Sequence, residues 1–321
     1  MDHTILIDQF FREQGLRVAV DWNCFQPPYH VESGWPLRLP EVDWAKTDFV
    51  ILIFQDFVTM QDGVCLELTQ VEQQYGDRAD QVIVLHWPHA LSRYYHGPVR
   101  LVEFNVHEYQ ILNNLRSCQK EWQQVWHGPR DRAWQCLNGR KCDHRLRVAQ
   151  HLKQHWNHGT VSLGDVVPLT GYPYSTYRGT SNEDNWLRLL PVYGQHHVNI
   201  VTETRYDQQP GIITEKTIFA LLAAQIPIVI GYRGIVQDCQ ELGFDMFTDI
   251  VDVSYDHLSD SCRWQAALHR NQDWISKYHP TAEISQRLLT QAKWLLMEWP
   301  QQHLEQALDQ LQLIVKAQDS Q

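Results

Sequence analysis

A chain of 321 residues exceeds what a single hydrophobic core usually covers, so two domains of about 150 residues are expected. With 43% hydrophobic and 20% charged residues, the composition excludes a disordered chain. The formal net charge of -11 argues against broad, non-specific attraction to nucleic acid or to an anionic membrane surface.

The N-terminal sequence and the cysteines indicate the cellular compartment. Asp2 and Asp8 stand where a signal peptide carries positive charge, and no apolar run reaches the roughly 18 residues of a membrane span. The seven cysteines are scattered and form no CxxC pair. We therefore expect a cytoplasmic protein with reduced thiols and no membrane segment.

Short apolar runs alternate with helical patterns in the first part of the chain. The runs are Arg17 to Asp21, Phe49 to Phe54, Gln81 to His86 and Val99 to Phe104. Runs rich in Val and Ile with few polar positions are typical of a parallel sheet covered on both faces, and the segment 64–75 is long enough for a crossover helix. The pattern predicts a Rossmann-like domain.

A helical pattern from His107 to Trp126 ends at Gly128-Pro129, which places a domain boundary there. We assign residues 1–127 to an N-terminal domain. The last helical pattern, in residues 300–321, carries an apolar stripe that has to pack on another element, and the N-terminal domain is the candidate.

The same alternation returns in residues 128–299, which predicts a second Rossmann-like domain. Strands are expected at 134–137, 160–163, 198–202, 226–230 and 250–253, and helices at 143–155, 214–224 and 236–242. Residues 164–196 lack clean periodicity and contain several Gly and Pro, which indicates a long loop with short elements. The fold class is therefore α/β, with two Rossmann-like domains.

The richest segment for chemistry is GIITEKTIFALLAAQIPIVIG, residues 211–231. Thr214 stands at an N-cap position, and Glu215 and Lys216 follow it directly. A helix N-terminus carries partial positive charge and free N–H groups, so a phosphate placed there meets backbone donors and Lys216 together. Glu215 in the first turn also suits a purely structural role, in which it favours the helix dipole.

A second segment, CLNGRKCDHRLRVAQHL, is basic. Between Arg130 and Lys153 seven Lys or Arg stand against two Asp. Arg140 and Arg145 are the better phosphate candidates, because a guanidinium grips a phosphate with two parallel hydrogen bonds. A solvated helix face explains the same pattern without a ligand.

A third segment, VNIVTETRY, ends a predicted strand in Thr202-Glu203-Thr204. A carboxylate at the carboxyl edge of such a strand commonly holds a ribose or sugar hydroxyl. The structural alternative for Glu203 is a salt bridge to Arg205 or Lys216.

These segments together resemble glycosyltransferases of the GT-B fold, most nearly the α-1,3-fucosyltransferase type and related viral and bacterial sequences. The resemblance covers residues 133–256. It rests on Asn138-x-Arg140, on IVTET followed by ITEKTIFALLAAQIPIVIG, on Gly243-Phe244 and on DIVDVSYD.

The resemblance implies two domains that face each other across a cleft, with a nucleotide-sugar donor held by the C-terminal one. Arg140 and Lys216 would hold the diphosphate, and Glu203 and Glu215 would lie near the ribose or donor sugar. Together with Asn138, Arg145 and Thr214, these residues form the expected donor site. Residues 1–127 would then be the acceptor domain, and the acceptor would be a glycan or another hydroxyl compound.

No strict Asp-x-Asp motif occurs, so we expect transfer without a metal or another cofactor. We also expect the transfer to be inverting. Such a reaction needs a base that removes the proton of the acceptor hydroxyl. Asp56, after the apolar run 49–54, is the first candidate, and Asp21 is the second. An ordinary polar residue at the start of a loop explains either position equally well.

Two other functions fit the same residues. The basic segment permits a transferase that modifies hydroxymethylated bases in DNA, although the net charge of -11 disfavours it. The third function is a non-catalytic nucleotide-binding or glycan-binding protein on the same scaffold, which binds nucleotide without hydrolysis or transfer.

Overall fold

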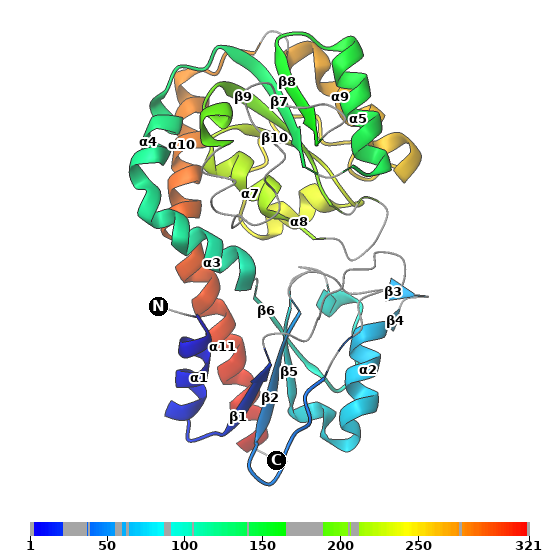
Figure 1. The fold of residues 1–321 in the computed structure, drawn as a ribbon, viewed down its shortest axis with the longest axis vertical. Coiled ribbons are helices and arrows are strands. Elements are labelled where there is room, and N and C mark those ends of the chain that lie inside the picture. Colours follow the sequence, from blue (N-terminus) through cyan, green and yellow to red (C-terminus); the bar gives the residue numbers. More distant parts are fainter. Residues whose placement is uncertain are drawn as a thin grey trace. The chain divides into compact units, whose positions relative to one another are not determined.

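The chain consists of two compact units, each built on its own parallel sheet. The computed structural model describes residues 3–21, 37, 39–54, 60–61, 64–86, 91–104, 106–139, 141–164, 189–204, 206, 212–275 and 278–319. Unit 1 contains Met1–Gln110 and Pro300–Gln321, and unit 2 contains Ile111–Trp299. Each unit has a four-stranded sheet with helices between its strands (Figure 1). This confirms the α/β class and the two Rossmann-like domains.

The sheet of unit 1 is parallel, and its strand order β1-β2-β5-β6 follows the chain. All four strands lie close to their predicted positions. Their bounds are β1 (Val18–Asp21), β2 (Phe49–Phe54), β5 (Val82–His86) and β6 (Arg100–Glu103). The chain between β2 and β5 contains a small antiparallel pair, β3 (Met60–Gln61) with β4 (Val64–Cys65), then α2 (Leu66–Tyr75) and the 3-10 turn η1 (Gly76–Gln81). A second 3-10 turn, η2 (Leu91–Arg93), precedes β6.

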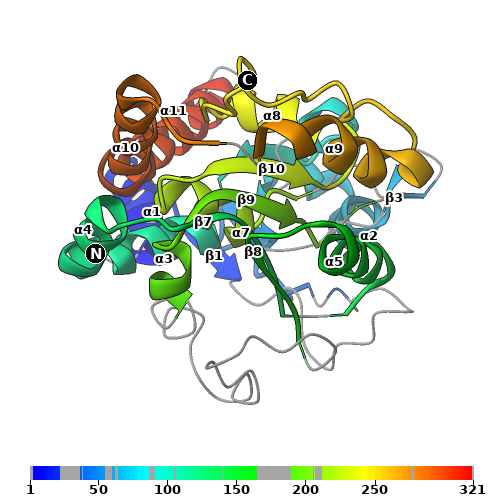
Figure 2. The same ribbon diagram turned by 90° about the horizontal axis from the view of Figure 1, so that it is seen from above.

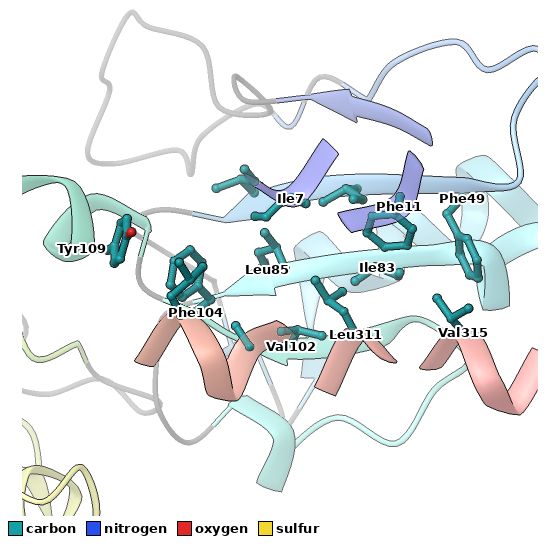
Figure 3. Close-up of a cluster of buried hydrophobic side chains, with 14 residues drawn as sticks. Ile7, Phe11, Phe49, Ile83, Leu85, Val102, Phe104, Tyr109, Leu311 and Val315 are labelled. Atoms are coloured by element: carbon teal, nitrogen blue, oxygen red, sulfur yellow. The ribbon is translucent and has the colours of Figure 1, made fainter. Parts of the chain in front are cut away.

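Strand β2 is buried on both faces, as the hydrophobic run predicts. Phe49, Ile51 and Ile53 belong to one core cluster, whereas the side chains between them belong to a second cluster with α2. The first cluster also receives side chains from α1 (His3–Glu13) and α11 (Trp299–Asp319), which Figure 3 shows around β5. Two-sided burial of a parallel strand requires such helices on both faces.

Helix α11 is an integral part of unit 1. Its residues Leu304, Ala307, Leu311 and Val315 are buried in the first cluster. The side chain of Arg100 on β6 donates to the carbonyl oxygen of Ile314 at 2.8 Å. The helix therefore completes the core of the N-terminal sheet from the far end of the sequence.

The helical pattern over 107–126 is two helices rather than one. Helix α3 (Val106–Leu115) ends in the 3-10 turn η3 (Arg116–Cys118), and α4 (Gln119–His127) follows. Cys118 leaves helical geometry with φ -95° and ψ 34°, and the side chain of Arg116 donates to the carbonyls of Leu296 and Met297. The single long helix was a wrong prediction.

Helix α4 packs within unit 2. The Trp122 ring lies 5.9 Å from the Phe219 ring, and the indole N–H of Trp126 donates to the carbonyl oxygen of Leu222 at 2.6 Å. Residues 111–127 therefore lie in unit 2, whereas the sequence analysis assigns them to the N-terminal domain.

The parallel sheet of unit 2 has the order β10-β9-β7-β8. Its strands are β7 (Arg132–Asn138), β8 (Gly159–Leu163), β9 (His196–Thr202) and β10 (Ile226–Ile230). Helix α5 (Asp143–His155) connects β7 to β8, and α7 (Glu215–Leu222) connects β9 to β10. The chain first adds β8 on one side of β7 and then adds β9 and β10 on the other side. The strand order therefore reverses beside β7, and ligands of open α/β sheets bind at such a reversal, outside the carboxyl ends of the strands.

Unit 2 also contains the helices α8 (Ile235–Glu241), α9 (Asp260–Ile275) and α10 (Ala282–Met297). Helix α9 contacts α5, and α10 contacts α7; Figure 2 shows α5 and α9 together at one end of the sheet. The strand predicted at 250–253 is wrong. The N–H groups of Ile250 and Val251 donate to the carbonyl oxygen of Phe247, each at 2.8 Å, so this segment is a turn.

Part of the long loop predicted at 164–196 has regular structure, because residues 189–193 are helical and β9 begins at His196. Residues 165–188 lie outside the described ranges. Within those ranges, the helices are all too short or too polar to cross a bilayer.

Candidate functional site

The carboxyl ends of β7 and β9 lie at the point where the strand order of unit 2 reverses. Asn138 is the last residue of β7 and Thr202 is the last residue of β9. The Thr202 hydroxyl donates to the side-chain carbonyl of Asn138, and both side chains are buried. This hydrogen bond joins the two strand ends from which the loops of a ligand site would start.

Glu203 follows β9 directly and is completely buried. Its Oε1 accepts hydrogen bonds from the backbone N–H of Thr214 at 3.1 Å and from the Thr217 hydroxyl at 2.6 Å. Its Oε2 accepts from the Thr214 hydroxyl at 2.5 Å. The carboxylate therefore fixes the first turn of α7 to the end of β9.

Lys216 lies in that first turn and is partly exposed. Its ammonium group is 2.5 Å from Glu215 Oε1, 3.2 Å from the Thr214 hydroxyl and 3.5 Å from the Thr204 hydroxyl. Thr214 also caps the helix, because its hydroxyl accepts from the Lys216 N–H at 3.4 Å. The segment Thr214-Glu215-Lys216 thus forms the predicted helix start, with a cation at the positive end of the helix.

Arg145 lies on α5 and is 3% exposed. Its Nε and Nη2 donate to the carbonyl oxygen of Thr202 at 3.2 and 3.0 Å, and Nη2 also donates to the Thr204 hydroxyl at 3.3 Å. The guanidinium therefore stabilises the end of β9 and the start of the following loop.

His144 and Tyr206 form an aromatic pair beside this edge. Their ring centroids are 4.9 Å apart, and the planes differ by 11°. His144 Nε2 lies 2.9 Å from the carbonyl oxygen of Glu203, which only accepts, so Nε2 is the protonated nitrogen. The guanidinium of the buried Arg263 lies 4.5 Å from the Tyr206 ring centre and donates to the carbonyl oxygens of Tyr206 and Gly231.

A pocket of about 450 Å³ opens beside these residues. It is lined by Cys142, Asp143, His144, Arg147, Thr204, Tyr206, Ser261 and Trp264. The first turns of α5 and α9 both contribute to this lining, and helix N-termini attract anions. Arg147 is exposed and pairs with no other residue in the part of the chain that the structure describes. Its charge is therefore open to a ligand.

Apart from the carboxylate of Asp143, the groups of this pocket suit an anion with attached polar groups. Thr204 connects its two parts, because it lines the pocket and its hydroxyl accepts from both Arg145 and Lys216. Arginine, lysine, hydroxyl groups and helix N-termini are the donors that phosphate binds in proteins. Among the described residues no group of three or more His, Cys, Asp or Glu is placed to hold a metal ion.

Six of the residues predicted for the donor site lie at this one edge of unit 2. They are Asn138, Arg145, Glu203, Thr214, Glu215 and Lys216. Arg140 lies outside the described residues, and so does Asp56. Asp21 is the last residue of β1 in unit 1. The predicted roles of all these residues in binding or catalysis stay predictions.

Several residues that shape the pocket are not among those predicted from the sequence. Tyr206, Arg263, Ser261 and Trp264 lie in or beside α9 or in the loop after β9. The buried positions Arg263, Trp264, Ala267, Leu268, Asn271 and Ile275 recur at helical spacing, so the periodicity of α9 could have been found. The contact of Tyr206 with His144 joins residues far apart in the sequence and has no local signal.

The chain is thus a two-unit, Rossmann-like α/β protein with a pocket at the carboxyl edge of its second sheet. Comparison of the chain with protein-family models, with curated proteins and with solved structures gives no match. The function is therefore argued from the residues themselves.

Proposed function

We propose that the protein is a glycosyltransferase that binds the diphosphate of a nucleotide-sugar donor at the carboxyl edge of the unit 2 sheet. The observation that carries the proposal is the pocket of about 450 Å³ at the reversal of the strand order. Two helix N-termini, the exposed Arg147 and Thr204 line this pocket, and Lys216 donates a hydrogen bond to the Thr204 hydroxyl. Open α/β sheets bind nucleotides at this kind of position.

The chemistry of sugar transfer gives these residues a function. When the bond between the sugar and the diphosphate breaks, negative charge develops on the leaving diphosphate. In the proposal, Lys216 and Arg147 stabilise that charge, with Arg140 as the third cation from the sequence motif. Metal-free transfer depends on protein cations of this kind.

The carboxylates of the site have separate roles in the proposal. Glu203 is completely buried, and both of its oxygens accept hydrogen bonds from Thr214 or Thr217. It therefore acts as a positioning residue for the start of α7. Glu215 is partly exposed and pairs with Lys216, so it is the carboxylate that can reach a ribose or sugar hydroxyl.

A specific observation favours a small donor over DNA as the partner of the basic segment. Of its seven cations, Arg145 is buried against the carbonyl oxygen of Thr202. Arg130 donates to the carbonyl oxygens of His196 and Ala223 at 2.5 and 2.6 Å. These two charges hold the fold together and are not presented to a nucleic acid. A glycan or another hydroxyl compound is the proposed acceptor.

The proposed reaction also needs a base for the acceptor hydroxyl, and Asp21 and Asp56 remain the candidates from the sequence. Substituting each by Asn while donor binding is followed separately identifies the base. Substitution of the true base should abolish transfer but leave the affinity for nucleotide unchanged.

The test is turnover of nucleotide sugars by the full chain. UDP-, GDP- and ADP-sugars are incubated with simple glycan acceptors, and release of the nucleotide is measured. We expect Lys216→Ala and Arg140→Ala each to lower turnover by about 10²-fold or more. Lys153→Ala, on the exposed face of α5, is the matched control and should retain full turnover. Wild-type turnover in both site variants would contradict the proposal, and nucleotide binding without any hydrolysis or transfer would favour the non-catalytic function.

A further inference from the structure

A second cavity of about 470 Å³ lies along α10 in unit 2 and shares no lining residue with the first pocket. We call it the α10 groove. It is lined by Gly243, Asp245, Glu283, Gln286, Arg287, Thr290, Gln291 and Trp294. The α10 residues recur at spacings of three and four, so they form one face of the helix. The volume falls within the roughly 300–1,000 Å³ of small-molecule sites.

The groove has a fixed shape. Arg287 Nη2 donates to Asp245 Oδ2 at 2.8 Å, and Nη1 donates to Asp249 Oδ2 at 2.7 Å. Gln291 accepts from the backbone N–H of Asp245 at 2.8 Å and donates to its carbonyl oxygen at 3.2 Å. Both Asp245 and Arg287 are thus held in place before any ligand arrives, which lowers the entropic cost of binding.

The backbone opposite α10 adopts a conformation that costs free energy. Phe247 has φ 53°, in the left-handed region that non-glycine residues rarely occupy. The Arg287 guanidinium lies 4.9 Å from the Phe247 ring centre. Arg287 therefore contacts this loop through the Phe247 ring as well as through Asp245 and Asp249. A loop kept in such a conformation by its surroundings is a common feature of binding sites.

The aromatic wall of the groove is Trp294. The ring is half-buried and packs edge-on against Phe244, with centroids 6.3 Å apart. A Cβ at Gly243 would lie 3.4 Å from Trp294 Cη2, and Gly243 has φ +85°. Glycine therefore suits the turn and keeps any larger side chain away from the edge of the indole ring.

The polar groups around Trp294 exclude two classes of ligand. Three carboxylates, Asp245, Asp249 and Glu283, stand against one guanidinium, so a phosphate or another anion would be repelled. A wholly apolar ligand would take the Glu283 carboxylate out of water without giving it a hydrogen-bond partner, which is unfavourable. Because Asp245 and Asp249 both pair with Arg287, little negative charge is left to attract a cation. The suitable ligand is therefore uncharged, with one apolar face and many hydroxyl groups.

A sugar ring has that chemistry, and we propose that the α10 groove binds a carbohydrate. The C–H face of the ring would pack on Trp294, and its hydroxyls would donate to Glu283 and to Gln286 and accept from the Gln286 amide. This site is separate from the donor site, and its existence does not depend on the glycosyltransferase activity proposed above.

The test is saturation-transfer NMR of the full chain with cellobiose, lactose, maltose and N,N′-diacetylchitobiose, with pyrophosphate and spermine as ionic probes. We expect at least one disaccharide to receive saturation on its ring C–H protons, and Trp294→Ala to weaken its binding about tenfold or more. Lys216→Ala should leave the signal unchanged, because Lys216 belongs to the other site.

A second variant keeps the test decisive if Trp294→Ala fails to fold. Thr290 is exposed on α10 and lines the groove, so Thr290→Trp fills the groove without disturbing the core. It should abolish the disaccharide signal while circular dichroism stays that of the wild type. No signal from any disaccharide, a signal that both groove variants retain, or spermine as the only probe that depends on Trp294 would overturn the proposal.

Discussion

Replacing Glu203 tests whether the buried carboxylate fixes the start of α7. Its two oxygens accept three hydrogen bonds, from the Thr214 N–H and from the hydroxyls of Thr214 and Thr217. In Glu203→Gln the amide oxygen keeps two of these bonds, and the third loses its charged acceptor. A hydrogen bond to a buried charged group contributes about 1.5–3 kcal/mol, so we expect the free energy of unfolding to fall by about that amount. Glu203→Ala loses all three bonds and leaves a cavity, and should cost about 4 kcal/mol or more.

Two measurements test this expectation. Urea unfolding followed by circular dichroism gives the free energy, and hydrogen exchange of the peptide amides in residues 212–225 locates the change. Glu241→Gln, at an exposed position of the same unit, is the matched control and should change neither the free energy of unfolding nor the hydrogen exchange of residues 212–225. A Glu203→Gln variant with wild-type stability and unchanged exchange in α7 would refute the reasoning.

Three further predictions concern other parts of the fold. Burial raises the pKa of Asp256 to about 6, so keeping this carboxylate ionised at pH 8 lowers the free energy of unfolding by about 3 kcal/mol. Asp256→Asn should therefore raise the melting temperature more at pH 8 than at pH 4. An equal effect at both pH values would contradict this. Burial lowers the pKa of His196 to about 4, so its contribution to stability is present above pH 6.5 and is lost as the pH falls toward 4. NMR should show no titration of this ring near pH 6.5, where an ordinary histidine is protonated. Leu311→Ala should cost about 2–5 kcal/mol because Leu311 is buried in the core of unit 1, whereas Leu313→Ala, at a position 68% exposed, should cost little in the same denaturant titration.

The parallel strands were predictable because their runs carry a strong local signal. The run 49–54 is apolar at every position, and all six of its residues are buried in β2. The segment 226–230 behaves in the same way in β10. Such continuous apolar runs occur where helices cover both faces of a sheet, so sequence pattern and tertiary environment agree.

The segment 250–253 shows why an apolar run does not always predict a strand correctly. Its apolar residues resemble a strand, yet Val251 is buried in a turn whose shape depends on the left-handed Phe247 and on Asn271 of α9, which accepts from the Asp252 N–H at 3.0 Å. Phe247 belongs to the same turn, whereas Asn271 lies 19 residues after Asp252 in the sequence. Local periodicity carries no information about them.

The candidate site, too, is only partly predictable from the sequence. The start of α7 could be found because Thr214 is an N-cap residue with a cation two positions later. The burial of Arg145 and Glu203 could not, because it depends on the hydrogen bonds that join β9 to α5 and α7. Sequence places charged residues at the carboxyl edge, and only the structure separates those that hold the fold from Arg147, which faces the pocket.

The most direct test of the central claim is titration calorimetry of the full chain with UDP, GDP, CDP and ADP. The account predicts that one nucleoside diphosphate binds, and that Lys216→Ala and Arg147→Ala each weaken it about tenfold or more, since each removes a charged phosphate contact. A ligand at about 100 times its dissociation constant should also stabilise the wild type by about 2.7 kcal/mol. Absence of binding by all four, or undiminished affinity in both variants, would contradict the claim that this edge of unit 2 holds a diphosphate.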